Sequence, residues 1–255
     1  MTPFDLSGRL AVVTGGNGGI GLGMARGLVA AGATVVLAAR NAEKGEVAVA
    51  SLTVCGAKST FIAFDVADEG SCRAMIEQTV ARFGRLDILV NNAGTSIRKP
   101  PESYTAAEWH AVLDTNLTGA LFCAQAAYPA MKQAGAGKII NIGSMYSIFG
   151  TSYGAAYAAS KGALVQLTKS LAIAWANDNI QVNAVLPGWI DTELTQGARR
   201  HVAELHDRVL ARTPAGRWGV PEDLAGIAVF LAAPASDFVT GAAIAVDGGY
   251  SSMGV

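Results

Sequence analysis

Short apolar runs rich in β-branched residues alternate along the chain with longer stretches whose apolar residues recur every three or four positions. The runs predict strands and the stretches between them predict helices. Such regular alternation is typical of a parallel sheet. We expect strands near Leu10–Val13, Thr34–Ala39, Ser59–Phe64, Ile88–Val90, Lys138–Ile142, Ile180–Val185 and Ala243–Val246, and helices that begin near Gly19, Ala42, Glu69, Ala106, Gly154 and Pro221.

Three of these runs, LAVV, TVVLAA and KIINI, contain almost no polar residue. Strands have this composition when helices cover both faces of their sheet. The 255 residues fit one large α/β domain, although about 150 residues per domain is the usual starting estimate. We therefore expect a single domain over residues 1–255, an α/β fold with a doubly wound, parallel, seven-stranded sheet and helices on both faces.

Residues 191–219 do not fit the alternation, because they are richer in charged side chains. The segment follows the carboxyl end of a strand, where open α/β sheets bind ligands. We expect a helical flap over a substrate site, with an ordinary solvated insertion as the alternative.

Composition excludes several classes of partner. Charged residues make up only 15% of the chain, against a usual share of about 25%, so we expect other subunits to cover part of the surface. The net charge of −1 lacks the basic footprint that nucleic acid binding requires. The longest charge-free stretch, Ile139–Ser160, is interrupted by polar residues, which excludes a membrane span. The first ten residues lack the apolar core of a signal peptide, so we expect a cytoplasmic protein.

Cysteine and histidine spacing predicts no metal site. Cys55, Cys72 and Cys123 form no C-x-x-C pair, so we interpret them as reduced packing residues. His201 and His206, five positions apart, do not share one face of a helix, and His110 lies far from both in the sequence.

A glycine-rich segment, Thr14-Gly15-Gly16-Asn17-Gly18-Gly19-Ile20-Gly21, joins the first strand directly to a helix. Glycines let the chain turn tightly and let a pyrophosphate approach the backbone at the helix N-terminus. The segment predicts a nucleotide phosphate site, with a tight turn that binds nothing as the alternative.

Tyr157 and Lys161 lie four apart in a helical stretch, so both side chains project from one face. A phenol with its ordinary pKa of about 10 is a poor base at neutral pH. A neighbouring ammonium group stabilises the phenolate, so we expect Lys161 to lower the pKa of Tyr157. Tyr-x-x-x-Lys is common on helices, but Ser144 at the end of the preceding strand makes the combination a candidate catalytic set.

The whole chain resembles the short-chain dehydrogenases/reductases. The resemblance is carried, in order, by Gly15-x-x-x-Gly19-x-Gly21, Asp65, Asn91-Asn92-Ala93-Gly94, Asn116, Ser144, Tyr157-x-x-x-Lys161 and Pro187-Gly188. It implies a Rossmann-type fold and hydride transfer between a nicotinamide cofactor and a secondary alcohol or ketone. Tyr157 would then be the general acid and base, and Ser144 would donate a hydrogen bond to the reacting oxygen.

The resemblance also implies roles around the cofactor. Lys161 would bind the nicotinamide ribose, and Asn116 would hold a water that relays protons to Lys161. The alternative for Asn116 is that it only kinks a helix. The residues expected at the cofactor are Gly15, Asn17, Gly19, Ile20, Gly21, Arg40, Asn41, Asp65, Val66, Asn92, Ala93, Gly94, Tyr157, Lys161, Pro187, Gly188, Ile190 and Thr192.

The end of the second strand favours NADP(H) over NAD(H). An NAD site usually presents a carboxylate there, whereas this chain has Ala39 followed by Arg40, whose planar fork suits a 2′-phosphate. Two observations leave the preference open. The alternative for Arg40 is a solvated charge at the strand end, and Gly18 stands where many NADP-dependent relatives carry a second basic residue.

The substrate is a small molecule, and Ser96, Met145, Phe149 and Trp189 are its expected contacts. Arg98, Lys99 and the flap arginines would attract a carboxylate. The segments Arg212–Gly219 and Gly143-Ser144-Met145 resemble gluconate 5-dehydrogenase and 2-deoxygluconate 3-dehydrogenase relatives, which favours a sugar acid or polyol. The alternative is that these segments are a scaffold shared widely in the family.

Two rival functions stay open. A 3-oxoacyl-carrier-protein reductase tends to carry basic residues where this chain has Gly135 and Asp178, although Lys132 and Lys138 lie nearby. A sensor that binds a nucleotide without turnover would have lost Ser144, Tyr157 or Lys161, and all three are present. By resemblance, the C-terminal residues 246–250 and two long helices, Ala106–Met131 and Gly154–Ala176, contact other subunits, so we expect a homotetramer.

Overall fold

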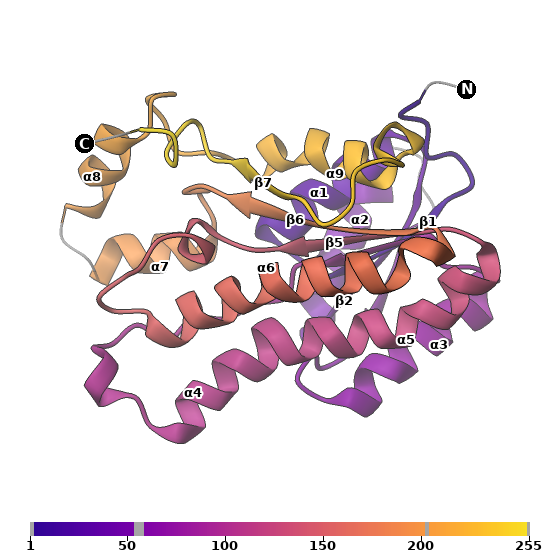
Figure 1. The fold of residues 1–255 in the computed structure, drawn as a ribbon, viewed down its shortest axis with the longest axis horizontal. Coiled ribbons are helices and arrows are strands. Elements are labelled where there is room, and N and C mark those ends of the chain that lie inside the picture. Colours follow the sequence, from indigo (N-terminus) through magenta and orange to yellow (C-terminus); the bar gives the residue numbers. More distant parts are fainter. Residues whose placement is uncertain (1–2, 54–58, 202–203, 254–255) are drawn as a thin grey trace.

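The computed structural model describes residues 3–53, 59–201 and 204–253. Its centre is a parallel sheet of seven strands in the order β3-β2-β1-β4-β5-β6-β7 (Figure 1). Each strand lies within a few residues of an expected run, so the predicted fold class, a Rossmann-type doubly wound sheet, is confirmed. The strands are β1 (Leu10–Thr14), β2 (Thr34–Ala39), β3 (Ser59–Ala63), β4 (Ile88–Asn91), β5 (Gly137–Ile142), β6 (Ile180–Pro187) and β7 (Ala243–Val246).

Helices pack on both faces of the sheet (Figure 1). Successive strand residues point to opposite faces, so Val13 and Leu37 join the apolar cluster under α1, α2 and α9, while Val12 and Val36 join the cluster under α3, α5 and α6. Both faces are therefore buried, which explains the missing polar alternation. The bounds are α1 (Gly19–Ala30), α2 (Ala42–Thr53), α3 (Glu69–Phe83), α5 (Gly119–Ala134), α6 (Ala155–Trp175) and α9 (Ala225–Ala232).

The stretch expected as one helix over Ala106–Met131 is interrupted. It forms α4 (Ala106–Leu113), a π-helical turn at Asp114–Thr118, and α5. A π-helical turn of this kind holds one residue more than the α-helix around it and is frequent at functional sites. The expected helix near Gly154 begins at Ala155, and the one near Pro221 begins with a 3₁₀ turn at Pro221–Leu224.

Two further helices, α7 (Glu193–His201) and α8 (Leu205–Arg212), lie within the expected flap, beyond the carboxyl end of β6 (Figure 1). Residues 202–203 of that segment lie outside the described part of the chain. The segment has an apolar cluster of its own, formed by Ala198, Leu205, Val209 and Trp218. It is therefore attached to the main cores through a small satellite cluster rather than buried in them.

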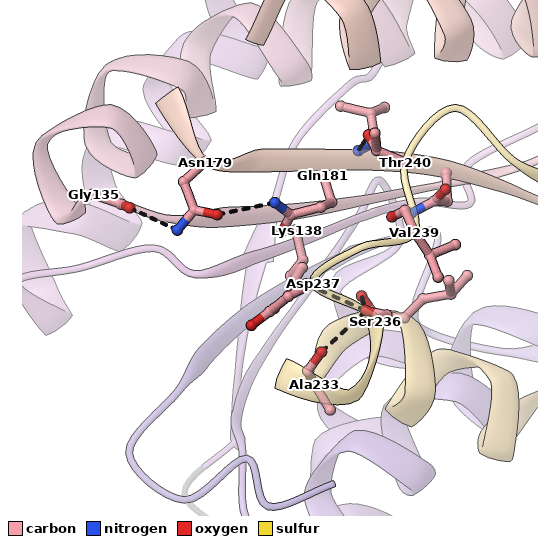
Figure 2. Close-up of polar contacts among 12 residues, drawn as sticks. Gly135, Lys138, Asn179, Gln181, Ala233, Ser236, Asp237, Val239 and Thr240 are labelled. Carbon is pink, nitrogen blue, oxygen red and sulfur yellow. Dashed lines mark hydrogen bonds and ion pairs between the residues drawn. The ribbon is translucent and has the colours of Figure 1, made fainter. Parts of the chain in front are cut away.

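The opposite, amino-terminal edge of the sheet is closed by polar contacts (Figure 2). Lys138 Nζ lies 2.7 Å from Asp237 Oδ1 and 3.3 Å from Ser236 Oγ. Gln181 Nε2 donates to Asn179 Oδ1 at 3.0 Å. A ligand site is therefore to be sought at the carboxyl edge.

Cys72 and Cys123 are buried and form no disulfide, whereas Cys55 lies outside the described residues. Within the described ranges no three His, Cys, Asp or Glu side chains gather into a metal-binding group. No helix in those ranges has the length and apolar character to cross a membrane.

Candidate active site

The strand order reverses between β1 and β4, which is the place where open α/β sheets bind ligands. Thr14 Oγ1 accepts hydrogen bonds from the backbone N–H groups of Asn92 (3.0 Å) and Ala93 (3.1 Å). Asn92 Nδ2 donates in return to the carbonyl oxygens of Thr14 (3.0 Å) and Gly15 (3.1 Å). The two strand ends are thus fixed against each other, and the crevice between them has rigid walls.

At several positions of the glycine loop after β1, the backbone conformation or the surrounding atoms leave no room for a side chain. Gly15 has φ +62° and Gly19 has φ +50°. A Cβ on Gly21 would lie 2.5 Å from Asn92 Nδ2, whereas a Cβ on Gly18 would meet nothing within 4 Å. The first N–H groups of α1 have no partner inside the helix and follow this loop directly. Together these features fit a pyrophosphate.

A cavity of about 590 Å³ opens along the carboxyl edge of the sheet. It brings most of the predicted site residues together, although three do not line it: Gly21 packs against Asn92, Asn116 is buried behind the wall, and Phe149 lies elsewhere. The predicted residues that do line it are Gly15, Asn17, Gly19, Ile20, Arg40, Asn41, Asp65, Val66, Asn92, Ala93, Gly94, Ser96, Ser144, Met145, Tyr157, Lys161, Pro187, Gly188, Trp189, Ile190 and Thr192.

One end of the cavity is formed by the loops that follow β2 and β3. No carboxylate stands at the end of β2, where Ala39 is 8% exposed, and the exposed Arg40 comes next. Arg40 has no ion pair with any described residue. Asp65 Oδ1 accepts a hydrogen bond from Ala67 N at 3.0 Å, and Val66 is buried beside it. This end offers a cation and an apolar wall, which suits the adenosine half of a phosphorylated dinucleotide.

Ser144, Tyr157 and Lys161 meet at the other end, where β5 ends and α6 begins. Ser144 Oγ accepts a hydrogen bond from Tyr146 N at 3.2 Å, and the Ser144 side chain also hydrogen-bonds to the Tyr157 phenol. The Ser147 hydroxyl connects the two elements, because it accepts from Ser144 N (3.1 Å) and donates to the Lys161 carbonyl (2.8 Å). The serine hydroxyl is therefore held in place relative to α6.

The electrostatics of Tyr157 differ from the sequence-based expectation. Burial raises the pKa of Tyr157, and Ser144 and the Arg98 guanidinium are the groups that lower it. Lys161 Nζ lies 5.7 Å from the centre of the Tyr157 ring and donates to the carbonyl of Ile142 at 2.6 Å. Burial lowers the pKa of Lys161 to about 8. The expected lowering of the Tyr157 pKa by Lys161 is thus not seen, because the ammonium group is buried and directed to a backbone carbonyl.

Asn116 lies in the π-helical turn and is 1% exposed. Its side chain accepts from Thr95 N (2.7 Å) and donates to Thr95 O (2.9 Å) and Ser160 Oγ (3.0 Å). Gly94 lies between this amide and Lys161, since a Cβ there would be 3.3 Å from Asn116 Oδ1 and 3.6 Å from Lys161 Nζ. The widened turn therefore orients the amide toward the loop after β4 and close to Lys161.

Aromatic side chains form the wall on the flap side. The Tyr146 ring makes edge contacts with Tyr157 (6.2 Å between centroids) and Trp189 (6.1 Å), and Trp189 makes another with Trp218 (5.6 Å). Phe149 does not belong to this wall, which corrects the sequence-based expectation. Its ring instead contacts Tyr250 and the Arg212 guanidinium, because an apolar partner from the C-terminal segment covers it there.

The positive charges predicted to attract a carboxylate are mostly occupied. Lys99 Nζ pairs with both oxygens of Glu108 at 2.7 and 2.8 Å, and Arg217 pairs with Asp223. Arg199 pairs with Asp191 and lies over the Trp218 ring. Arg98 lines the cavity, and its hydrogen bond among the described residues is a long one, 3.4 Å, to the Leu194 carbonyl. Arg98 is therefore the cation most free to bind a substrate at this end.

Sequence reasoning missed Lys44 and Glu193, which also line the cavity and pair with each other. Lys44 lies in the first turn of α2, four residues after Arg40, and Glu193 begins α7. Its position four residues after Arg40 could have indicated that Lys44 lies at the same end of the cavity. Glu193 had no such signal, because its partner is 149 residues away.

The fold, the glycine loop and the side chains at the end of β5 define the class as a nucleotide-dependent oxidoreductase. A family model described as "Enoyl-(Acyl carrier protein) reductase" matches residues 15–251. The chain is 42% identical to the gluconate 5-dehydrogenase of Gluconobacter oxydans over 248 residues, 96% of each chain. It is 41% identical to the 2-dehydro-3-deoxy-D-gluconate 5-dehydrogenase of Dickeya dadantii over 251 residues, 98% of each.

Solved structures agree with this likeness. The gluconate 5-dehydrogenase of Burkholderia cenocepacia J2315, in complex with NADP and tartrate, is 44% identical and superposes with a TM-score of 0.94 over 99% of this chain and 98% of that one. The chain belongs to the short-chain dehydrogenase/reductase family, as its motifs predict. It is accordingly an oxidoreductase.

Proposed function

We propose that this protein is an NADP(H)-preferring dehydrogenase that interconverts a secondary alcohol and a ketone on a sugar acid. One observation carries the proposal: Ser144, Tyr157 and Arg98 face the same cavity, and the charge of Arg98 lowers the pKa of Tyr157. A carboxylate held by Arg98 would place the rest of a small hydroxy acid beside the serine and the tyrosine.

The nicotinamide, when bound, supplies or accepts the hydride. In reduction, the Ser144 hydroxyl donates a hydrogen bond to the carbonyl oxygen, where negative charge develops, and Tyr157 delivers the proton. In oxidation, Tyr157 is the base. Lys161 binds the nicotinamide ribose. Asn116 holds a water that passes protons to Lys161, which is supported by the approach of both side chains to Gly94.

The cofactor contacts follow the cavity. The loop from Gly15 to Gly21 binds the pyrophosphate, and Asp65 and Val66 bind the adenine. Asn92, Ala93 and Gly94 lie along the ribose, and the backbone and side chains of the loop from Pro187 to Thr192 bind the carboxamide. The preference for NADP(H) is supported by Ala39 in place of a carboxylate and by Arg40, and NADP is bound by the Burkholderia relative.

The substrate class rests on Arg98 and on the relatives, two of which are named for sugar acids. Arg98 offers two parallel N–H donors to a carboxylate. Lys99 lacks this geometry, and its ammonium group is already paired with Glu108. Ser96, Met145 and Trp189 form the remaining walls. The segment formed by α7 and α8 closes over them as a flap.

The protein acts in the cytoplasm as a homotetramer. Support for the assembly comes from apolar side chains that are exposed in the single chain. Phe238 is fully exposed, Ile173 is 81% exposed, and the outer strand β7 leaves Ala243 and Ala245 exposed. Light scattering on a size-exclusion column measures the assembly. A single-chain mass would remove this part of the proposal.

The function is tested with a panel of sugar acids, polyols, diketones and acyl thioesters, each with NADP(H) and NAD(H), by following the absorbance of the reduced nicotinamide. We expect turnover with a five- or six-carbon keto or hydroxy acid, and a higher kcat/KM than with the matching polyol. Turnover confined to carrier-linked acyl thioesters would identify a carrier-protein reductase instead. The surface that would meet an acidic carrier protein argues against that outcome, because Lys132 is already paired with Asp178.

A further inference from the structure

Lys44 and Glu193 form an ion pair across the adenosine end of the cavity. Lys44 Nζ lies 3.0 Å from each carboxylate oxygen of Glu193. Lys44 belongs to the element that follows β2, and Glu193 belongs to the element that follows β6, on the other side of the crevice. Both residues line the cavity together with Arg40. The pair therefore bridges the opening through which the nucleotide end of a cofactor would be reached.

Lys44 stands where a cation does not help its own helix. It lies in the first turn of α2, near the positive end of the helix dipole, and its backbone N–H is already bound by Asn41 Oδ1 at 2.9 Å. Asn41 thereby caps the helix, so the ammonium group contributes nothing to the cap. The ammonium group instead faces the cavity, where its partner in this structure is the Glu193 carboxylate.

The pair itself is weak. The Lys44 side chain is 54% exposed and the Glu193 side chain 85% exposed. Ion pairs this exposed stabilise a fold by about 0–1 kcal/mol, so a doubly charged phosphate competes for the ammonium at little cost. Arg40, four residues earlier, carries the other cation at this end. Arg40 and Lys44 can thus approach one phosphate from two neighbouring positions of the chain.

We propose that Lys44 binds the 2′-phosphate of NADP(H) beside Arg40, and that Glu193 competes with the phosphate for the Lys44 ammonium. This inference rests on the proposed preference for NADP(H). In this proposal a residue of the flap limits the preference for NADP(H). The Glu193 carboxylate weakens phosphate binding because it occupies Lys44 and because its own negative charge repels the phosphate. A cofactor without the 2′-phosphate leaves the ion pair in place, so neither residue changes its binding affinity.

The test is calorimetric binding of 2′,5′-ADP and of 5′-AMP, which differ by this phosphate and contain no nicotinamide. We expect Lys44→Met to weaken 2′,5′-ADP binding about tenfold and Glu193→Gln to strengthen it about threefold, with 5′-AMP changed less than twofold by either. Arg26→Met is the matched control. It removes an ion pair of similar exposure, Arg26 with Glu222, away from the cavity.

The double variant Lys44→Met/Glu193→Gln separates direct contact from simple neutralisation. If Lys44 contacts the phosphate, the double variant binds 2′,5′-ADP more weakly than Glu193→Gln alone. Equal binding by those two variants would overturn the proposal, as would a Lys44→Met variant within twofold of the native protein. Native protein that binds 2′,5′-ADP no better than 5′-AMP would instead refute the proposed cofactor preference.

Discussion

Replacing Tyr157 with Phe removes one oxygen atom from the site and leaves the packing of the ring in place. The edge contact with Tyr146 and the Lys161 ammonium group over the ring both involve the aromatic carbons. The phenol lines the cavity and is half-buried, so its oxygen is not part of the packed core. We therefore expect an unfolding temperature within about 2 °C of the native value, since surface and interior contacts change little.

The size of the loss in kcat depends on the catalytic groups that remain in the Tyr157→Phe variant. A positioned general acid contributes a factor of about 10²–10⁴ to the rate, and in the variant Ser144 can still donate a hydrogen bond to the oxygen where negative charge develops. We expect kcat to fall by about 10³ in both directions, while the dissociation constant for NADPH, measured by fluorescence, changes less than about threefold. The assay follows the absorbance of the reduced nicotinamide under saturating substrate. A variant that keeps more than a tenth of native kcat would refute the assignment of Tyr157 as acid and base.

The remaining predictions concern three other residues. Arg98→Met removes a charge that lowers the pKa of Tyr157, so the rise of oxidation rate with pH moves to higher pH and KM for a sugar acid rises about tenfold; Arg98→Lys restores the pH profile more than KM. Gly21→Ala places a Cβ 2.5 Å from Asn92 Nδ2 and weakens NADPH binding about tenfold, whereas Gly226→Ala on α9 meets nothing within 4 Å and leaves binding unchanged. Asp87→Asn lowers the free energy of unfolding by about 2 kcal/mol at pH 7, measured by urea titration.

The sign of the Asp87 effect follows from its surroundings. Burial alone would raise the pKa of this carboxyl, but hydrogen bonds from Arg85, Leu10 N and Arg9 outweigh it, so its pKa lies below the ordinary value. A lowered pKa contributes stability above the unfolded pKa of about 3.9, and that contribution is lost as the pH falls through the folded value. The difference between native protein and Asp87→Asn should therefore shrink below about pH 4. A difference that grows on acidification would contradict this account.

The sequence predicts the central strands β1, β4, β5 and β6 well because they are apolar runs buried on both faces, with no competing helical period. The interruption at Asp114–Thr118 escapes the same reasoning, since one extra residue in a turn leaves every side chain compatible with a helix. Phe149 was misplaced for another reason. An apolar residue in a loop near Ser144 suits a substrate wall, and only the fold shows that Tyr250 covers it.

The candidate site divides into parts with different mechanical support. Thr14, Asn92 and Ser144 stand at strand ends and are held by hydrogen bonds that join one strand or helix to the next, so their positions follow from the sheet. Trp189 and Glu193 belong to the segment after β6, which packs around Trp218 in a cluster separate from the main cores. Substitutions in that segment therefore alter the walls while the strand-end hydrogen bonds stay in place. We therefore expect substitutions in that segment to change substrate recognition more than proton transfer.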